Sequence, residues 1–84
     1  MHTIYVLKSE KDDNLYIGCT SDLISRLKMH QSGNVRSTKG RLPVVLIYKE
    51  DFNDKYIAFN MERFYKTAKG KKALKEKLNH YRFV

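Results

Sequence analysis

The chain has little of several features that would point to other kinds of protein. It holds a single cysteine, Cys19, so it can form neither an internal disulfide nor a multi-cysteine zinc site. Its longest apolar run, Val44 to Tyr48, is far too short to cross a bilayer. Its first residues lack the basic-then-apolar layout of a signal peptide, and it has no internal repeats. We therefore expect a soluble, cytoplasmic protein with a single domain over residues 1–84.

Acidic residues are also scarce relative to basic ones. Seventeen lysines and arginines stand against nine aspartates and glutamates, which leaves a net charge of +8 at pH 7. An excess of this size attracts polyanions and speeds their encounter with the protein, although it says nothing about the fold. DNA, RNA or an anionic membrane surface are the partners that this charge favours. A basic surface without any such partner is the alternative.

Alternating apolar residues predict a β-hairpin at the start of the chain. Residues 3–8 and 15–19 are rich in β-branched and aromatic residues, and the polar stretch 9–14 between them is turn-like. If the apolar residues of both strands face the same layer, the alternation places Tyr5 and Tyr16 together on the opposite face. We therefore expect two phenols side by side.

A helical pattern follows the hairpin. Thr20 or Ser21 can cap the start of this helix, and Asp22 suits the positive end of the helix dipole. Arg26 lies at the edge of the apolar side and one turn before His30, so these two side chains should be neighbours. The residues expected on the buried side are Leu23, Ile24, Leu27 and His30.

The remainder of the chain predicts one strand and two helices. After a basic loop over residues 34–42, residues 44–50 carry apolar side chains on both faces, which is typical of a strand covered on both sides. Asp54 can cap a helix over residues 55–69, with Glu62 at the border between core and solvent. Its expected buried residues are Ile57, Met61, Phe64, Tyr65 and Ala68.

A break at Gly70 separates this helix from a lysine-rich one over residues 71 to about 81. The elements then follow the order strand, strand, helix, strand, helix, helix. This order predicts an α+β fold in which a small central, mainly antiparallel three-stranded sheet is flanked by helices.

Several short motifs occur in series along the chain. Thr3-Ile4-Tyr5 is followed by Tyr16-Ile17-Gly18, whose tyrosine comes eleven residues after Tyr5. Next come Arg26 and His30, a loop from Ser32 to Lys39, Glu62, and Lys69-Gly70-Lys71. In this order and spacing the motifs resemble the GIY-YIG nuclease superfamily, above all its short stand-alone bacterial members (excinuclease N-terminal-like and UPF0213-like). The resemblance covers about residues 3–78 and implies a divalent-metal-dependent DNA endonuclease.

By this resemblance, four residues have roles in phosphodiester hydrolysis. Tyr5 is the favoured general base and Tyr16 positions the water or the phosphate, although the two phenols are chemically alike and the division stays open. A phenol ordinarily keeps its proton up to about pH 10, so a tyrosine base needs a cation nearby. Arg26 binds phosphate because it is always charged and can engage two oxygens. His30 holds Arg26 or a tyrosine in place, or shuttles a proton; a half-buried helix histidine without function is the alternative.

The resemblance makes Glu62 the sole carboxylate ligand of one Mg²⁺ or Mn²⁺ ion, with water and substrate oxygens completing the shell. Such an ion would stabilise the pentavalent phosphorus and the departing oxygen. The alternative is a surface pair with Lys66, worth less than about 0.5 kcal/mol. Several relatives carry an asparagine close to the phosphate, about a dozen residues after the glutamate, a position that falls near Leu74 in this chain.

A set of basic residues is expected to grip the nucleic-acid backbone without reading bases. These residues are Arg36, Lys39, Arg41, Lys66, Lys69, Lys71 and Lys72, with Lys75 and Lys77 as further members. The expected substrate is DNA, cleaved with structural guidance or weak sequence preference, while RNA stays open because nothing here reads the sugar. Targeting would come from a protein partner or a homodimer, and a membrane role is disfavoured. The alternative function is a nucleic-acid-binding module with the same fold and little or no activity.

Overall fold

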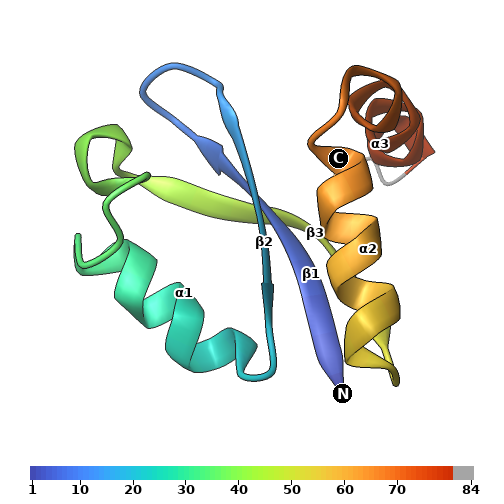
Figure 1. Cartoon of the computed structure of the whole chain (residues 1–84). Helices are drawn as coiled ribbons and strands as arrows, with labels where there is room; N and C mark the ends of the chain where they lie inside the picture. Colours follow the sequence, from blue (N-terminus) through green and yellow to red (C-terminus); the bar gives the residue numbers. More distant parts are fainter. Residues whose placement is uncertain (81–84) are drawn as a thin grey trace.

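The computed structural model describes residues 1–80, which form an α+β fold (Figure 1). In chain order the elements are β1 (His2–Ser9), β2 (Leu15–Thr20), α1 (Leu23–Gln31), β3 (Val44–Phe52), α2 (Lys55–Tyr65) and α3 (Ala68–His80), with a short 3₁₀ turn, Lys39–Arg41, before β3. The predicted fold class and element order are confirmed. None of the helices within residues 1–80 has the length and apolar content that a transmembrane segment requires.

The three strands form one antiparallel sheet in the order β2-β1-β3. The central strand β1 is the most deeply buried, and β2 and β3 are edge strands. The expectation that the third strand is covered on both sides is wrong, since Val45 and Leu46 are each 38% exposed. Its apolar residues occur on both faces, but at the edge of the sheet the flanking helices do not enclose it.

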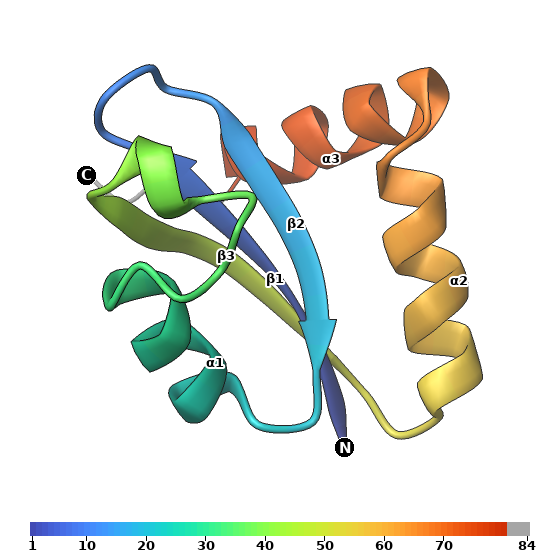
Figure 2. The same cartoon turned by 60° about the vertical axis from the view of Figure 1, so that its left-hand side comes forward.

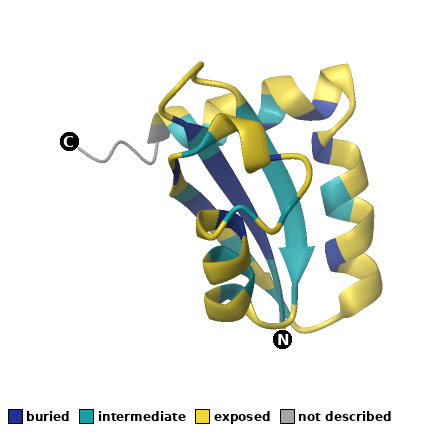
Figure 3. Cartoon of the chain, turned by 90° about the vertical axis from the view of Figure 1, so that its left-hand side faces the viewer, coloured by how far each residue is buried: buried dark blue, intermediate teal, exposed yellow. Residues whose placement is uncertain are grey.

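Helices cover the two faces of the sheet from opposite sides (Figure 2). On one face, α1 packs against a cluster that contains Tyr5 and Leu7 of β1. On the other face, Ile4 and Val6 of β1 contact α2 and α3 through a cluster that contains Tyr65. Figure 3 shows β1 buried between these layers and the outer sides of the helices exposed. Tyr5 therefore lies on the face of the sheet that α1 covers, and α2 lies on the opposite face.

Helix α1 begins one step later than predicted. Its N-cap is Asp22, whose carboxylate accepts a hydrogen bond from the Ser25 N–H at 3.1 Å, rather than Thr20 or Ser21. The Thr20 hydroxyl instead accepts from the Asp22 N–H at 3.0 Å and shapes the approach to the helix. Ile24 is 70% exposed rather than buried. It lies about 100° around the helix from Leu23, which packs against the sheet.

The prediction for the second helix was correct at its start and partly wrong in its buried side. Asp54 caps α2 as predicted, accepting a backbone N–H of the first turn at 2.7 Å. Ile57 and Phe64 are 53% and 37% exposed, however, while Ala58 and Tyr65 are fully buried. The helix is rotated so that Ala58 and Tyr65 face the sheet, which turns Ile57 and Phe64 toward solvent.

The break between α2 and α3 lies at Lys66 and Thr67 rather than at Gly70. The Thr67 hydroxyl accepts a hydrogen bond from the Gly70 N–H at 3.0 Å and so caps α3. Gly70 lies inside α3, where a Cβ atom would run into the backbone carbonyl of Phe64. It allows close contact between the helices and does not end one. The predicted end of the last helix near residue 81 lies outside the described residues.

A polar network ties α2 and α3 to β3. The Glu50 carboxylate accepts hydrogen bonds from the Tyr48 hydroxyl at 2.6 Å, the Tyr65 hydroxyl at 3.0 Å and the Lys77 ammonium at 3.0 Å. Burial alone would raise the pKa of Glu50, but these donors bring it below its ordinary value. Lys77 was expected on the nucleic-acid surface, and its ammonium is engaged in this network.

Replacing Glu50 is expected to weaken the attachment of the two C-terminal helices. In Glu50→Gln an amide group meets hydrogen-bond donors, so the free energy of unfolding should fall by about 1–3 kcal/mol. Urea unfolding at neutral pH measures this loss, and Glu76→Gln on the exposed side of α3 is the matched control. Because the pKa of Glu50 is lowered in the folded chain, its contribution shrinks as the pH falls below the ordinary value of 4.5. A gap between wild type and variant that persists unchanged at acidic pH would contradict this assignment.

Candidate active site

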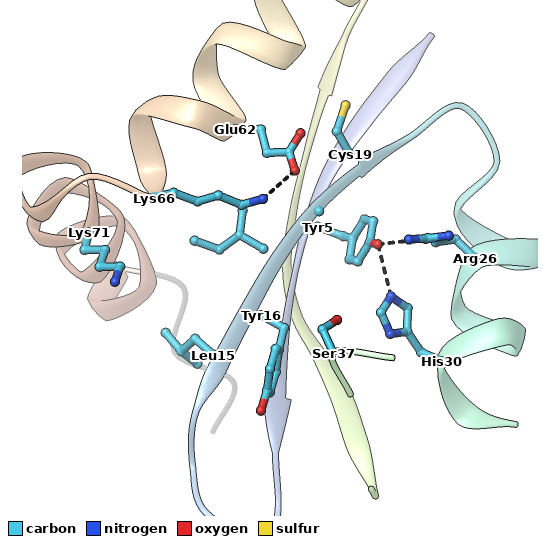
Figure 4. A pocket seen from close by; sticks show the side chains of 12 residues that line it. Tyr5, Leu15, Tyr16, Cys19, Arg26, His30, Ser37, Glu62, Lys66 and Lys71 are labelled. Carbon is cyan, nitrogen blue, oxygen red and sulfur yellow. Dashed lines mark hydrogen bonds and ion pairs between the residues drawn. The ribbon is translucent and has the colours of Figure 1, made fainter. Parts of the chain in front are cut away.

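A pocket of about 440 Å³ lies along the edge strand β2 and is lined by residues from β1, β2, α1, α2 and α3 and from the loop after α1 (Figure 4). The candidate residues selected from the sequence all contribute to it: Tyr5, Tyr16, Arg26, His30 and Glu62. Lys66 and Lys71 complete its basic side. The structure thus brings together, in one hollow, side chains that are spread over most of the chain.

Gly18 is what allows Tyr5 to reach this pocket. Tyr5 stands on the central strand, directly opposite Gly18 on β2. A Cβ atom at position 18 would overlap both the hydroxyl and the ring of Tyr5. The ring therefore lies over the bare backbone of Gly18, and its hydroxyl arrives at the edge of the sheet although the residue is only 2% exposed. A glycine is needed at position 18 because the Tyr5 ring fills the space that a side chain would occupy.

Two residues of α1 hold the Tyr5 hydroxyl. The Arg26 Nε–H donates a hydrogen bond to it at 3.1 Å, and His30 Nε2 lies 3.1 Å from it. The His30 ring also meets the Tyr5 ring edge-on, with centroids 5.6 Å apart and an interplanar angle of 72°. The spacing of four residues between Arg26 and His30 places both on the side of the helix that faces Tyr5.

A fourth residue joins this network, and no role for it is predicted from the sequence. The Thr38 hydroxyl lies 2.8 Å from His30 Nδ1, on the side of the ring away from Tyr5, and Thr38 is fully buried. It comes from the loop between α1 and the 3₁₀ turn. In the sequence, Thr38 is marked only by its position in the loop from Ser32 to Lys39, which resembles the loop of the family.

His30 is more than a half-buried helix residue. It is 3% exposed, and both of its ring nitrogens have a polar neighbour within hydrogen-bond distance. Burial, and then the positive charge of Arg26, lower the pKa of His30 below its ordinary value of 6.5. The imidazole is therefore neutral at neutral pH, the form that can accept a proton.

Tyr16 shares a face of the sheet with Tyr5 but does not share its hydrogen bonds. The register pairs Tyr16 with Leu7, so it is a diagonal neighbour of Tyr5. The common face is confirmed. The expected side-by-side hydroxyls are wrong, because Gly18 occupies the position opposite Tyr5. Figure 4 shows the Tyr16 hydroxyl pointing away from that of Tyr5, and it has no hydrogen-bond partner among the described residues.

Glu62 reaches the pocket from the other face of the sheet. Because α2 lies opposite α1, the carboxylate approaches around the edge strand, beside Cys19 (Figure 4). Its side chain is 21% exposed, which agrees with the predicted position at the border between core and solvent. Its Oε2 lies 2.9 Å from Lys66 Nζ, so the surface pair with Lys66, the alternative to a metal ligand, is present in this structure. Burial, and then the charge of Glu62, raise the pKa of the Cys19 thiol. The thiol therefore stays protonated and is no nucleophile at neutral pH.

The donor set around Glu62 suits a hard cation whose shell is completed by substrate. Glu62 is the only carboxylate among the described residues that line the pocket. Residues 1–80 also contain no cluster of three or more histidine, cysteine, aspartate or glutamate side chains that could form a complete cage. Magnesium is commonly held by one or two carboxylates, with water and phosphate oxygens supplying the rest. The residues present fit such an ion, and Lys66 would compete with it for the carboxylate.

The predicted nucleic-acid-binding lysines divide into two groups. Lys66 and Lys71 lie in the pocket lining, on the same side as Glu62. Lys69 and Lys72 are exposed on α3 and lie outside the pocket. Leu74, near the position where several relatives carry an asparagine, is buried in the core.

The predicted basic loop lies on the α1 side of the pocket. Arg36 and Lys39 are exposed in it, and the intervening Ser37 lines the pocket. Arg41 is partly engaged, because its Nε lies 3.1 Å from the Asp12 carboxylate of the β1–β2 turn. Basic side chains therefore lie on both sides of the phenol and the carboxylate.

Comparison with known proteins places these features in context. The sequence pattern described as "GIY-YIG catalytic domain" matches residues 1–79. The chain is 39% identical over 75 residues to a UPF0213 protein of Staphylococcus haemolyticus, which covers 88% of this chain and 90% of that protein. It is 42% identical over 72 residues to the UPF0213 protein YazA of Bacillus subtilis, covering 84% and 72%. A solution NMR structure of a UPF0213 protein from Bacillus halodurans matches with a TM-score of 0.57 and 32% identity, over 89% of this chain and 82% of that one.

Adding one methyl group at position 18 should displace Tyr5. Gly18→Ala forces its Cβ into the Tyr5 ring, and overpacking of this kind lowers the free energy of unfolding by about 1–3 kcal/mol. Gly40→Ala is the matched control, because a Cβ there meets nothing within 4 Å. Urea unfolding measures both variants, and equal stability of the two would show that Tyr5 does not depend on the space above Gly18.

His30 should titrate below pH 6.5 when followed by NMR. Since its pKa is lower in the folded chain than in the unfolded chain, acidification favours the unfolded state. The free energy of unfolding should therefore fall as the pH drops through the ordinary histidine value of 6.5, and His30→Gln should flatten that dependence. Titration at or above the ordinary value would contradict the expected effect of burial.

Proposed function

Because the chain belongs to the GIY-YIG family and to its UPF0213 group, we propose that it is a divalent-metal-dependent endonuclease that hydrolyses phosphodiester bonds in DNA. The supporting observation is that the Tyr5 phenol, the Arg26 guanidinium and the Glu62 carboxylate all line one pocket. Phosphodiester hydrolysis needs an activated water, stabilisation of charge on the phosphoryl oxygens, and help for the leaving oxygen. The groups in the pocket match these three needs.

In this mechanism Tyr5 is the general base. It is favoured over Tyr16 because its hydroxyl is the one held by Arg26 and His30. A guanidinium donor beside the oxygen stabilises the phenolate that can take a proton from water. Tyr16, with its hydroxyl free of protein partners among the described residues, is left to position the water or the phosphate.

Arg26 also binds the scissile phosphate. Its Nε–H is the group engaged by Tyr5, and within residues 1–80 its terminal nitrogens make no hydrogen bond or ion pair. These nitrogens can engage two phosphate oxygens at once. One side chain thereby fixes the distance between the base and the phosphorus.

Glu62 is the proposed metal ligand, with Lys66 as its partner in the free chain. A divalent ion held there with water and phosphate oxygens supplies stabilisation of charge on the phosphoryl and leaving oxygens. Lys66 would then release the carboxylate, and its ammonium would stay beside the phosphate together with Lys71. With the ion in place of Lys66 at the carboxylate, the pocket would keep a net positive charge, which favours a polyanion.

The proposed substrate is DNA that is recognised by shape or with weak sequence preference. The candidate contacts, which include Arg36, Lys39, Lys66 and Lys71, are cationic groups that bind phosphates and do not read bases. A protein partner or a second copy of the chain would supply targeting, and a reducing cytoplasmic setting suits the lone cysteine. RNA is the second substrate to test.

Nicking of supercoiled and branched DNA in Mg²⁺ or Mn²⁺ tests the proposal. Tyr5→Phe should lower the rate about 10²–10⁴-fold, the usual contribution of a general base. Glu62→Gln should abolish metal-dependent nicking, whereas Glu76→Gln, remote from the pocket, should leave it unchanged. A matched RNA assayed in parallel measures the preference between the two nucleic acids.

Two results would overturn parts of the proposal. Binding of DNA without metal-dependent nicking of any substrate would favour the binding module instead. Equal and mild losses in Tyr5→Phe and Tyr16→Phe would exclude both phenols as the base. A larger loss in Tyr16→Phe would exchange their roles.

A further inference from the structure

The loop before β3 places one buried hydroxyl against the far side of the His30 ring. Thr38 is fully buried, and its Oγ1 lies 2.8 Å from His30 Nδ1. The same hydroxyl makes a longer contact, 3.5 Å, to the backbone carbonyl oxygen of Val35, to which it can donate. The catalytic scheme above gives Thr38 no part, although it touches a residue that holds the proposed base.

The positions of the hydrogens on Tyr5, His30 and Thr38 follow from the Arg26 Nε–H, which can only donate. Arg26 Nε always carries a hydrogen, so the Tyr5 oxygen accepts the bond from Arg26. The hydroxyl hydrogen of Tyr5 then needs an acceptor, and His30 Nε2 at 3.1 Å is the one that the described residues offer. A neutral imidazole carries a single N–H, so with Nε2 accepting, the hydrogen lies on Nδ1 and is donated to Thr38.

The opposite tautomer leaves the network incomplete. With a hydrogen on Nε2, the Tyr5 oxygen would accept from both His30 and Arg26, and its own hydrogen would find no acceptor among the described residues. Thr38 would have to donate to Nδ1 and turn away from Val35. The arrangement with the hydrogen on Nδ1 gives every hydrogen in the series an acceptor.

We propose that Thr38 is a positioning residue of this site: its hydroxyl accepts the His30 Nδ1–H and thereby keeps Nε2 free to take the proton of Tyr5. The catalytic meaning of this assignment depends on the proposed function, whereas the tautomer depends only on the geometry. Thr38 can accept from Nδ1 both before and after His30 is protonated, because both ring nitrogens of an imidazolium are donors. The same hydrogen bond therefore serves both states of the ring.

The resulting proton movements balance. The Tyr5 hydroxyl proton passes to His30 Nε2, which leaves a phenolate that accepts a bond from Arg26. The phenolate takes a proton from the attacking water as the bond between the water oxygen and phosphorus forms. The bond from phosphorus to the leaving oxygen breaks, the leaving oxygen keeps the electron pair and takes a proton from solvent, and His30 returns its proton to solvent.

NMR of the ¹⁵N-labelled full chain, without nucleic acid or metal, tests the tautomer directly. At about pH 8, where His30 is neutral, correlations between ring hydrogens and nitrogens identify which nitrogen is protonated. We expect the hydrogen on Nδ1 in wild type and in Thr38→Ser, which keeps the hydroxyl. In Thr38→Val, which keeps the shape and loses the hydroxyl, the form with the hydrogen on Nε2 should increase. A wild-type hydrogen on Nε2, or no change in Thr38→Val, would overturn the assignment.

Nicking kinetics test the consequence for the reaction. Thr38→Val should lower kcat about tenfold with KM unchanged, the equivalent of one neutral hydrogen bond, and Thr38→Ser should retain most of the rate. An equal loss in Thr38→Ser, or a change confined to KM, would show that the side chain only fills space or affects binding. If wild type nicks no substrate, the proposed function fails, and the NMR result still decides whether Thr38 sets the tautomer.

Discussion

The site depends on the contact between one aromatic ring and one glycine. Tyr5 begins on the central strand, where both faces of the sheet are covered, and a residue there would ordinarily be part of the core. Its hydroxyl reaches the edge of the sheet only because Gly18 presents no side chain beneath the ring. Arg26 and His30 then meet a group that the core already holds in place. Rigid elements supply the precision that a catalytic group needs.

The charges in the pocket are arranged around this fixed phenol. Arg26 lies on one side of β2, Lys66 and Lys71 lie on the other, and Glu62 is the single negative group among the described lining residues. A pocket with this balance of charges favours anions. The Glu62 carboxylate lies 2.9 Å from the Lys66 ammonium, so a cation that bound there would compete with the lysine.

Patterns over a few neighbouring residues correctly predicted the features that depend only on such neighbours. Alternation placed Tyr5 and Tyr16 on one face, and Asp54 marked the start of α2, because strand faces and helix caps depend on near neighbours along the chain. The predictions of burial were wrong where burial depends on elements that are distant in the sequence. Whether Val45 is covered depends on which strand lies at the edge, and whether Ile57 is buried depends on which side of α2 faces the sheet.

The same distinction applies to the site. The motif residues could be chosen from the sequence because their types and spacing resemble a family, and the five that were expected to take part in the chemistry all line the pocket. Their hydrogen-bond partners could not be chosen in that way. Thr38 meets His30 only after the loop folds back over α1, and the need for Gly18 becomes visible only when the Tyr5 ring is placed above it.

The approach of Glu62 around the edge of the sheet has a consequence for when the protein could act. The phenol, guanidinium and imidazole all come from the first half of the chain, and the carboxylate comes from a helix that docks on the opposite face. A chain cut between β3 and α2 would keep the phenol, the guanidinium and the imidazole and would lack the carboxylate. The full set of pocket side chains is therefore assembled only once α2 has docked on the sheet.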